Sequence, residues 1–336
     1  MAILAILAMG MGRRGTMNIT LAFLVFLVAF AILLKSADWF VDGAVGIAYL
    51  LHLPKMLVGI VLMGLATTSP ELAVSVISAY QGHPSIALGN AVGSVIADDG
   101  LALALAAIIA SRISIDRRLL KRVGLFLIGV FSLSFLLAYD AEVTRIEGLI
   151  LVVLLILYFV YLVWSERRRR NESPPLIGLE PDVAELGIGK IVLLFSGGAV
   201  GVIISSHLIV TSGLFIAKTF RVPEIVIGLT LIALGTSLPE VSTAIVAARK
   251  GHAEVTVGNI LGADILNILL IIGASAVVHP IQVDPKDIRF AYPWAFLVVT
   301  VMLLSMWHRH TLTRKKGVLL LVLYGIYLVQ VVHSYF

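Results

Sequence analysis

Two segments of the chain place a glutamate beside a proline within a long apolar stretch. They read TTSPE at residues 67–71 and TSLPE at residues 236–240. A proline inside a helix removes one backbone hydrogen bond and clashes with the carbonyl four residues before it, so each segment predicts a broken helix. The freed carbonyls, the hydroxyls, and the carboxylates of Glu71 and Glu240 form a set of oxygen ligands. Hard cations such as Ca²⁺ and Na⁺ prefer oxygen ligands, so the two segments predict a cation site.

Further polar residues occur in the apolar segment that follows each motif. They are Asn90, Ser94 and Asp98 after the first motif, and Asn259 and Asn267 after the second. Ser94 and Asp98 are four residues apart and therefore share one face of a helix. If Asp98 joins the two glutamates, the site carries up to three negative charges. Two of them would balance one Ca²⁺, and the third would require Na⁺ or a shared proton.

Two aspartates close to these residues have no assigned role. Asp99 points about 100° away from the aspartate before it on an ideal helix. Asp264 is three residues before Asn267 and could support its side chain.

Other charged or titratable residues are expected to have structural roles. His83 and His252 each follow a glycine in a turn and are expected to be solvated, with pH sensing as the alternative. Lys35 and Asp38 are three residues apart, a spacing that predicts an ion pair along one helix.

The composition predicts which kind of elements must position these residues. The chain has 336 residues, of which 60% are hydrophobic and 13% charged, and its mean hydropathy is +1.04. A soluble domain carries about 25% charged residues. Apolar runs of about 20 residues can cross a hydrocarbon core of about 30 Å, so the sequence predicts an all-α membrane protein. The chain has no cysteine, which excludes thiolate sites and disulfides, and its basic residues in short connections indicate topology rather than nucleic-acid binding.

Ten apolar runs are predicted to cross the membrane. Five lie near 18–50, 54–80, 85–110, 120–139 and 144–165, and five near 188–217, 223–249, 254–278, 290–307 and 317–335. We therefore expect a poorly defined N-terminal extension (1–16), a first five-helix repeat (17–165), a linker (166–187) and a second five-helix repeat (188–336). The connections on one side hold 17 Lys and Arg residues and those on the other side seven. This bias predicts a cytoplasmic linker and outside termini, in the cell (inner) membrane.

The two halves of the chain contain an internal duplication. A shift of 169 residues aligns 65–98 with 234–267 without a gap, and eleven of these 34 positions are identical. Because each half has five spans, an odd number, the two repeats are expected to be inverted relative to each other. Inverted repeats place the substrate site near the membrane midplane, at broken helices. The GxxxG pairs at 89/93 and 258/262 more simply predict close helix packing.

The duplicated segments resemble the signature of one transporter family. The stretches LATTSPELAVSVISAYQGHPSIALGNAVG and ALGTSLPEVSTAIVAARKGHAEVTVGNILG are similar to the repeats of the calcium/cation antiporter superfamily, in its prokaryotic sodium/calcium exchanger branch. The resemblance covers nearly the whole chain. It implies a central Ca²⁺ bound by Glu71 and Glu240 with the carbonyls of Thr67 and Thr236. It further implies Na⁺ sites that use the Gly64 and Ala233 carbonyls, Thr68, Ser237 and Ser94, and a polar pair formed by Asp98 and Asn267.

Two positions depart from the family pattern. Ala263 stands where the family commonly has serine, so one flanking Na⁺ site would lose a hydroxyl, and Val95 stands opposite Asp264. The glutamate motif of the proton/calcium branch, which follows Gly-Asn, is missing. We therefore expect Na⁺/Ca²⁺ antiport by alternating access, with H⁺/Ca²⁺ or other divalent-cation exchange at the same site as the alternative. A single chain is expected to suffice for transport, with the lipid bilayer as its surroundings and no resident cofactor.

Two readings of another class remain weaker. An intramembrane aspartyl protease would use Asp140, after Tyr139, and Asp264 in Gly-Ala-Asp, but it leaves the duplicated Pro-Glu motif unexplained. A passive channel would use the same ligands without a coupling ion.

Overall fold

The computed structural model describes residues 18–51, 55–80, 82, 84–172, 187–219, 233–282 and 285–335. The first half contains α2 (Ile19–Leu51), α3 (Lys55–Val58), the π-helical η1 (Gly59–Met63), α4 (Gly64–Thr67), α5 (Ser69–Tyr80), α6 (Pro84–Ala97), the π-helical η2 (Asp98–Ala102), α7 (Leu103–Ala110), β1 (Arg112–Ser114), α8 (Arg117–Ala138), β2 (Glu142–Val143) and α9 (Arg145–Glu172). The second half contains α11 (Ile188–Thr219), α13 (Ala233–Thr236), α14 (Leu238–Arg249), α15 (Ala253–Leu266), the π-helical η4 (Asn267–Ile272), α16 (Gly273–Val278), β3 (Ile281–Gln282), α17 (Pro285–Trp307), the 3₁₀ turn η5 (His308–His310), β4 (Thr311–Thr313) and α18 (Arg314–Tyr335).

Helices long enough to cross a membrane dominate the described part of the chain. Seven of them qualify by length and hydropathy, or eight if the bent pair Met56–Thr67 and Ser69–Ile77 forms one broken span. Two further spans are predicted from the sequence. Residues 223–232 of the first lie outside the described residues. The second forms α18, which starts with three basic residues and is not among these seven. The count of ten therefore stays a prediction. Helix α9 continues to Glu172, within the predicted linker 166–187, because no proline interrupts it before Pro174.

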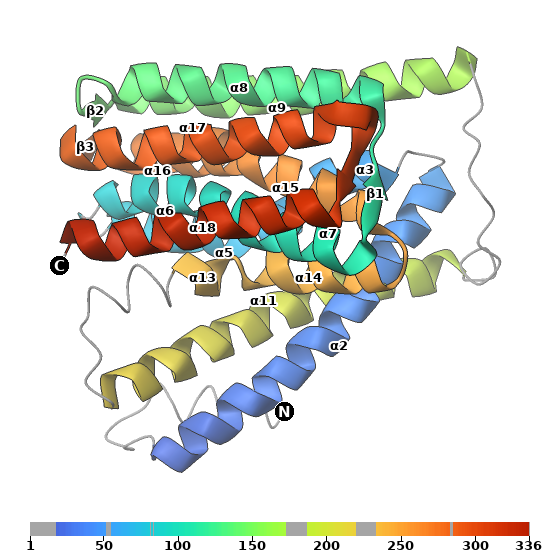
Figure 1. Cartoon of the computed structure of the whole chain (residues 1–336), viewed down its shortest axis with the longest axis horizontal. Helices are drawn as coiled ribbons and strands as arrows, with labels where there is room; N and C mark the ends of the chain where they lie inside the picture. The colour runs from blue at the N-terminus through green and yellow to red at the C-terminus, as the bar shows by residue number, and fades with distance from the viewer. Residues whose placement is uncertain are drawn as a thin grey trace.

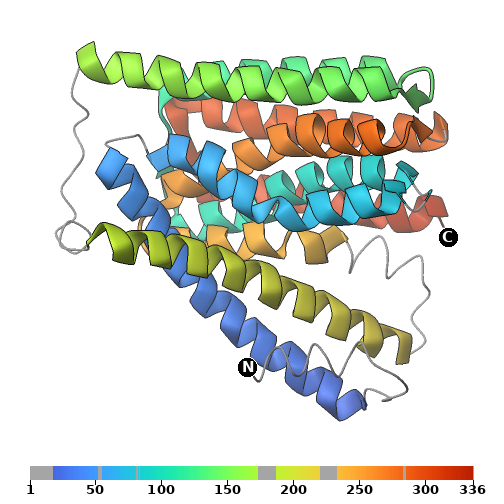
Figure 2. The ribbon, with the colours of Figure 1, turned by 180° about the vertical axis from the view of Figure 1, so that it is seen from behind.

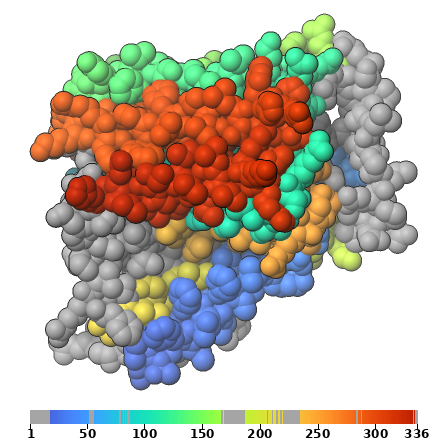
Figure 3. Space-filling model, viewed as in Figure 1, coloured from blue at the N-terminus to red at the C-terminus, as the bar shows by residue number. Residues whose placement is uncertain are grey.

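The helices fall into a central layer and outer helices. The segments Ala253–Val278 and Ala87–Ala110 are 83% and 72% buried, whereas Arg145–Ser165 on α9 is only 28% buried. Figure 1 shows α8 and α9 along one edge of the bundle, and Figure 3 shows α17 and α18 covering one face. These two deeply buried segments carry Asn259 and Asn267, and Asn90, Ser94 and Asp98, whereas the outer helices present apolar side chains outward.

Helices α2 and α11 cross each other as a pair beside the remaining bundle (Figures 1 and 2). Their contact relies on glycine, because a Cβ added to Gly43 or Gly198 would overlap the backbone of Phe195 or Phe40. A Cβ on Gly201 would meet the Ser36 side chain in the same way. Small residues at such crossings let two membrane helices approach closely.

Two short antiparallel sheets lie at opposite ends of the bundle (Figure 1). Strand β1 pairs with β4, with Ile113 opposite Leu312, and β2 pairs with β3, with Val143 opposite Ile281. A shift of 169 residues moves β1 onto β3 and β2 onto β4. The duplication seen in the sequence therefore exchanges one sheet with the other.

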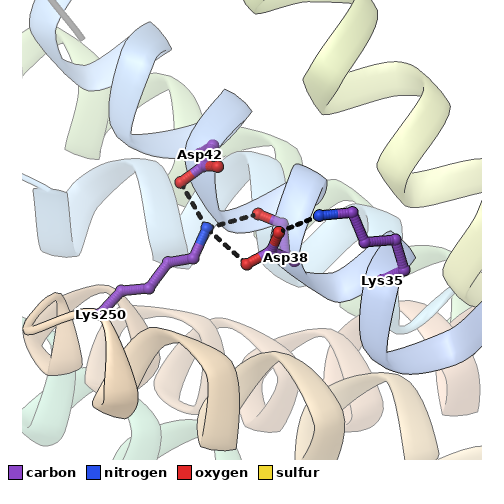
Figure 4. A network of polar contacts seen from close by, with 4 residues as sticks. All are labelled: Lys35, Asp38, Asp42 and Lys250. Carbon is purple, nitrogen blue, oxygen red and sulfur yellow. Dashed lines mark hydrogen bonds and ion pairs between the residues drawn. The ribbon is translucent and has the colours of Figure 1, made fainter. Parts of the chain in front are cut away.

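A four-residue ion-pair network connects α2 to the turn after α14 (Figure 4). Nζ of Lys250 lies 2.7 Å from Oδ1 of Asp38 and 2.7 Å from Oδ1 of Asp42. It also donates to the Asp38 carbonyl over 3.2 Å. Nζ of Lys35 lies 2.8 Å from Oδ2 of Asp38, which confirms the pair predicted from their spacing.

Replacing Lys250 by methionine is expected to lower the apparent melting temperature of the purified protein by about 2–4 °C. The change leaves Asp42 without the ammonium that holds it to α14, and Lys250 is only 25% exposed. Thermal unfolding at low and high salt measures the effect. Lys35→Met is the matched control and should cost less, since Lys35 pairs with Asp38 within one helix, whereas Lys250 joins α2 to the turn after α14. Equal losses in both variants would contradict the role given to Lys250.

Candidate ion-binding site

The first Pro-Glu motif breaks its helix at Thr68. Helix α4 ends at Thr67 and α5 begins at Ser69, with an angle of 41° between the two parts of the span. Thr68 has φ −78° and ψ 0°, and its carbonyl accepts the N–H of Leu72 over 3.1 Å. Pro70 has no N–H, so the carbonyl of Ala66 has no helical donor. The predicted break is therefore present, and the proline explains why the backbone leaves the regular helix there.

The second motif has the same backbone geometry at Ser237. This residue separates α13 from α14 and has φ −84° and ψ 7°, close to the values of Thr68. Its carbonyl accepts the N–H of Val241 over 3.0 Å, as Thr68 accepts from Leu72. Pro239 lies in the first turn of α14 and limits its helical hydrogen bonding as Pro70 does in α5. Positions related by 169 residues thus have the same local structure.

The two glutamates are buried immediately after these breaks. Glu71 and Glu240 are each 1% exposed. Within the described part of the chain, both carboxylate oxygens of Glu71 and Oε2 of Glu240 have no hydrogen-bond partner. The charges of Glu240 and Asp98 both act on Glu71, which places the three carboxyl groups in one region. Because a buried unpaired carboxylate is costly, this region requires a cation or protons.

Asp98 and Asn267 form a polar pair between the two halves. Nδ2 of Asn267 donates to Oδ2 of Asp98 over 3.4 Å, and both residues are 1% exposed. Each is the first residue of a π-helical segment, η2 or η4. Such π segments are rare and are frequent at functional sites. The remaining oxygens, Oδ1 of Asp98 and Oδ1 of Asn267, have no partner among the described residues.

The hydroxyls predicted to bind flanking ions are also buried. The Oγ atoms of Thr68, Ser94 and Ser237 have no hydrogen-bond partner in the part of the chain that the structure describes. Gly64 is buried at the start of α4, and its carbonyl accepts the N–H of Thr68 over 3.0 Å. Ala233 is the first residue of α13, directly after the undescribed residues 220–232.

The predicted site residues whose side chains the structure describes are all buried. They are Thr67, Thr68, Glu71, Ser94, Asp98, Thr236, Ser237, Glu240 and Asn267. Among the described residues, no three His, Cys, Asp or Glu side chains form a metal site by themselves. A cation at this place would thus need carbonyl and hydroxyl oxygens beside the carboxylates, and the ligand roles stay predictions.

One pair of buried aspartates has no role in the sequence-based site. Asp99 and Asp264, from η2 and α15, are both 0% exposed and close enough to interact across the two halves. An ideal helix turns Asp99 away from Asp98, but the π-helical segment beginning at Asp98 changes the rotation per residue. No pattern in the sequence indicates that segment in advance.

Burial in the structure bears on the two turn histidines and on the aspartyl-protease alternative. His252 is 6% exposed and directly precedes α15, a helix whose residues are almost all buried, so the expectation of a solvated turn residue is wrong. His83 lies outside the described residues. Asp140 is exposed in the turn before β2, whereas Asp264 is fully buried, so the structure does not bring together the two aspartates that a protease would need.

Comparisons with known proteins give a consistent result. The family profile described as "Sodium/calcium exchanger protein" matches residues 21–165 and 190–332. The chain is 29% identical over 345 residues to the sodium/calcium exchanger MaX1 of Methanosarcina acetivorans, a match that covers 93% of this chain and 98% of that protein. It is 30% identical over 293 residues to the inner membrane protein YrbG of Escherichia coli, which covers 86% of this chain and 90% of that protein.

A solved structure has the same fold over nearly the whole chain. It is the sodium-calcium exchanger NCX_Mj soaked with 2.5 mM Na⁺ and 10 mM Sr²⁺, with a TM-score of 0.78 and 28% sequence identity. The similarity covers 92% of this chain and 98% of that chain.

Proposed function

Because the chain belongs to the sodium/calcium exchanger family, we propose that it exchanges Ca²⁺ for Na⁺ at the region between Glu71 and Glu240. Members of this family are membrane transporters, so the chain is a multi-pass cation antiporter rather than an enzyme. The observation that carries the proposal is the pair of buried glutamates, one from each half, at two matched helix breaks. Two carboxylates supply the charge that balances one Ca²⁺, and transport needs only the carried ions, with no resident cofactor and no second chain.

The ligands in this proposal come from both halves. Ca²⁺ is bound by the two glutamates and the carbonyls of Thr67 and Thr236. Na⁺ uses the carbonyls and hydroxyls on either side of this centre: Gly64, Ala233, Thr68, Ser237 and Ser94. Asp98, with Asn267 beside it, takes the third positive charge as Na⁺ or a proton. Seven of these residues have oxygens without a hydrogen-bond partner in the described chain, which supports the assignment, since oxygen donors suit both cations; they are Thr68, Glu71, Ser94, Asp98, Ser237, Glu240 and Asn267.

Uptake of ⁴⁵Ca²⁺ into proteoliposomes tests the coupling ion. Vesicles loaded with Na⁺ should accumulate Ca²⁺, and Na⁺-free vesicles should not, whether or not a pH gradient is imposed. Uptake driven by the pH gradient alone would establish the proton-coupled alternative. Uptake without either gradient would indicate a channel.

One residue favours the proton-coupled alternative. Ala263 is fully buried in α15, at the position where the other half has Ser94, with its hydroxyl. A site that lacks this oxygen binds Na⁺ less tightly, because each lost ligand leaves the ion incompletely solvated.

Ala263→Ser is therefore expected to increase the apparent affinity for Na⁺ by about fivefold, the effect of one added polar contact of about 1 kcal/mol. Na⁺-driven ⁴⁵Ca²⁺ uptake at increasing Na⁺ concentration measures this change. Ala276→Ser is the matched control, since Ala276 is also fully buried but lies in α16. An unchanged Na⁺ dependence in Ala263→Ser would mean that this position does not contact the ion.

We also propose that the ten predicted spans form two inverted repeats with both termini outside. The exchange of the two sheets by the 169-residue shift supports this topology. Because the chain has no cysteine, single introduced cysteines report their side directly. An impermeant maleimide applied to intact cells should label Asp140→Cys, before β2, and should not label Ser114→Cys, in β1. The opposite labelling would reverse the proposed orientation.

A further inference from the structure

Two asparagines occupy matched positions beside the helix breaks. Asn90 in α6 and Asn259 in α15 are related by the 169-residue shift, and each follows a glycine. Helix α15 contacts α4, which ends at the first break, and α6 contacts α13, which ends at the second. Each asparagine therefore lies against the broken helix of the opposite half.

The asparagines accept hydrogen bonds from threonines of that opposite half. Oγ1 of Thr67 lies within donating distance of Oδ1 of Asn259, at 3.2 Å, and of the Met63 carbonyl in the same half, at 3.1 Å. Oγ1 of Thr236 donates to Oδ1 of Asn90 over 3.3 Å. The 169-residue shift that relates the halves places Thr67 on Thr236 and Asn90 on Asn259, so the two bonds are equivalent. Both threonines are the last helical residues before their breaks, so the bonds connect the halves at the two breaks themselves.

The amide nitrogens of the same asparagines donate within their own half. Nδ2 of Asn259 donates to Oγ1 of Thr243 over 3.4 Å. Nδ2 of Asn90 donates to Oγ of Ser75 over 3.0 Å and to the Glu71 carbonyl over 3.4 Å. A primary amide can accept on one side and donate on the other, whereas an ionised carboxylate only accepts. The side-chain chemistry thus fits the contacts on both sides.

We propose that Asn90 and Asn259 are positioning residues that join the two halves and fix the backbone of Thr236 and Thr67 at the ion site. The inference rests on the proposed function, in which the carbonyls of these threonines bind Ca²⁺. Because the connecting groups are neutral, they set the spacing of the site without adding charge to it. Ligands held in place before an ion arrives bind it more tightly, because less ordering is needed on binding.

The test uses cation-dependent thermal stabilisation of the full-length protein in detergent. The variants are Asn259→Leu, Thr67→Val and the double variant, with Thr67→Ser as a conservative variant that keeps the hydroxyl. Thr256→Val is the matched control, because Thr256 is 1% exposed in the same helix and its Oγ1 has no hydrogen-bond partner in the described chain. Each protein is titrated with Ca²⁺, and the half-stabilising concentration and the ion-free melting temperature are recorded.

The half-stabilising Ca²⁺ concentration should rise about fivefold to tenfold in Asn259→Leu and in Thr67→Val, the effect of one lost neutral hydrogen bond. The double variant should lose little more than either single variant, in affinity and in ion-free melting temperature, because both changes remove the same bond. Thr256→Val should bind Ca²⁺ like the wild type, and Thr67→Ser should recover most of the affinity that Thr67→Val loses, because it keeps the hydroxyl.

Three results would overturn the inference in distinguishable ways. If the wild type is stabilised by Ca²⁺ and the Asn259→Leu variant binds it equally well, the asparagine does not position the ligands. If Ca²⁺ does not stabilise the wild type, the proposed function fails and the positioning role fails with it. A lower ion-free melting temperature with unchanged Ca²⁺ affinity would reduce the bond to a purely structural contact and so contradict the proposal.

Discussion

Glu240→Gln is expected to reduce Ca²⁺ transport at least about 100-fold. Glu240 is 1% exposed, and its carboxylate lies near those of Glu71 and Asp98. Glutamine keeps the shape of the side chain but removes one of the two charges that balance Ca²⁺ in the centre. Removing one partner of a buried charge pair costs about 3–5 kcal/mol, which corresponds to more than 100-fold in binding. ⁴⁵Ca²⁺ uptake into proteoliposomes, at a measured amount of reconstituted protein, gives the result.

The matched controls for this variant use the same chemical change elsewhere. Glu142→Gln, at the exposed position of β2, should transport like the wild type. Glu71→Gln, at the equivalent position of the other half, should lose as much as Glu240→Gln. Normal transport by Glu240→Gln would mean that Ca²⁺ is carried at some other place in the protein.

Gly262→Ala is expected to destabilise the protein by about 3 kcal/mol or more. A Cβ at Gly262 would overlap the carbonyl oxygen of Ile60 and would lie 2.7 Å from its Cα. These are backbone atoms, which cannot rotate away as a flexible side chain can. Overpacking commonly costs about 1–3 kcal/mol and can cost more, and here it would separate α15 from η1 beside the site. Yield and melting temperature after detergent extraction measure the loss.

Gly325→Ala is the matched control and, unlike Gly262→Ala, is not expected to destabilise the protein. Nothing in the described chain lies within 4 Å of a Cβ added to Gly325, which is exposed on α18. Alanine is a better helix former than glycine by about 1 kcal/mol, so this variant should be as stable as the wild type or more stable. Equal behaviour of the two alanine variants would show that α15 does not need its glycine for close packing.

The sequence predicts the helix breaks well because their cause is local. Pro70 and Pro239 disrupt the helices in which they lie, and the resulting backbone at Thr68 and Ser237 is nearly identical. The ion pair between Lys35 and Asp38 is predictable for the same reason, since it joins residues one turn apart. Burial of the glutamates follows from their place inside apolar runs.

Contacts between the two halves could not be predicted in the same way. Asn90 and Asn259 are visible as polar residues, but their threonine partners lie 146 and 192 residues away in the chain. The proximity of Asp99 to Asp264 depends on a π-helical segment that no residue pattern indicates. His252 is buried at the start of α15, a helix that is itself almost entirely buried, whereas its glycine neighbour alone suggested an exposed turn. Such features depend on three-dimensional packing rather than local residue preferences.

The most direct test of the account locates the cation itself. Crystals of the protein soaked with Sr²⁺, a heavier ion with the oxygen preference of Ca²⁺, would show its position by anomalous scattering. The account predicts one peak between the carboxylates of Glu71 and Glu240, within coordination distance of the Thr67 and Thr236 carbonyls, and no such peak in Glu240→Gln. A peak beside Asp99 and Asp264 instead, with the two glutamates uncoordinated, would contradict it.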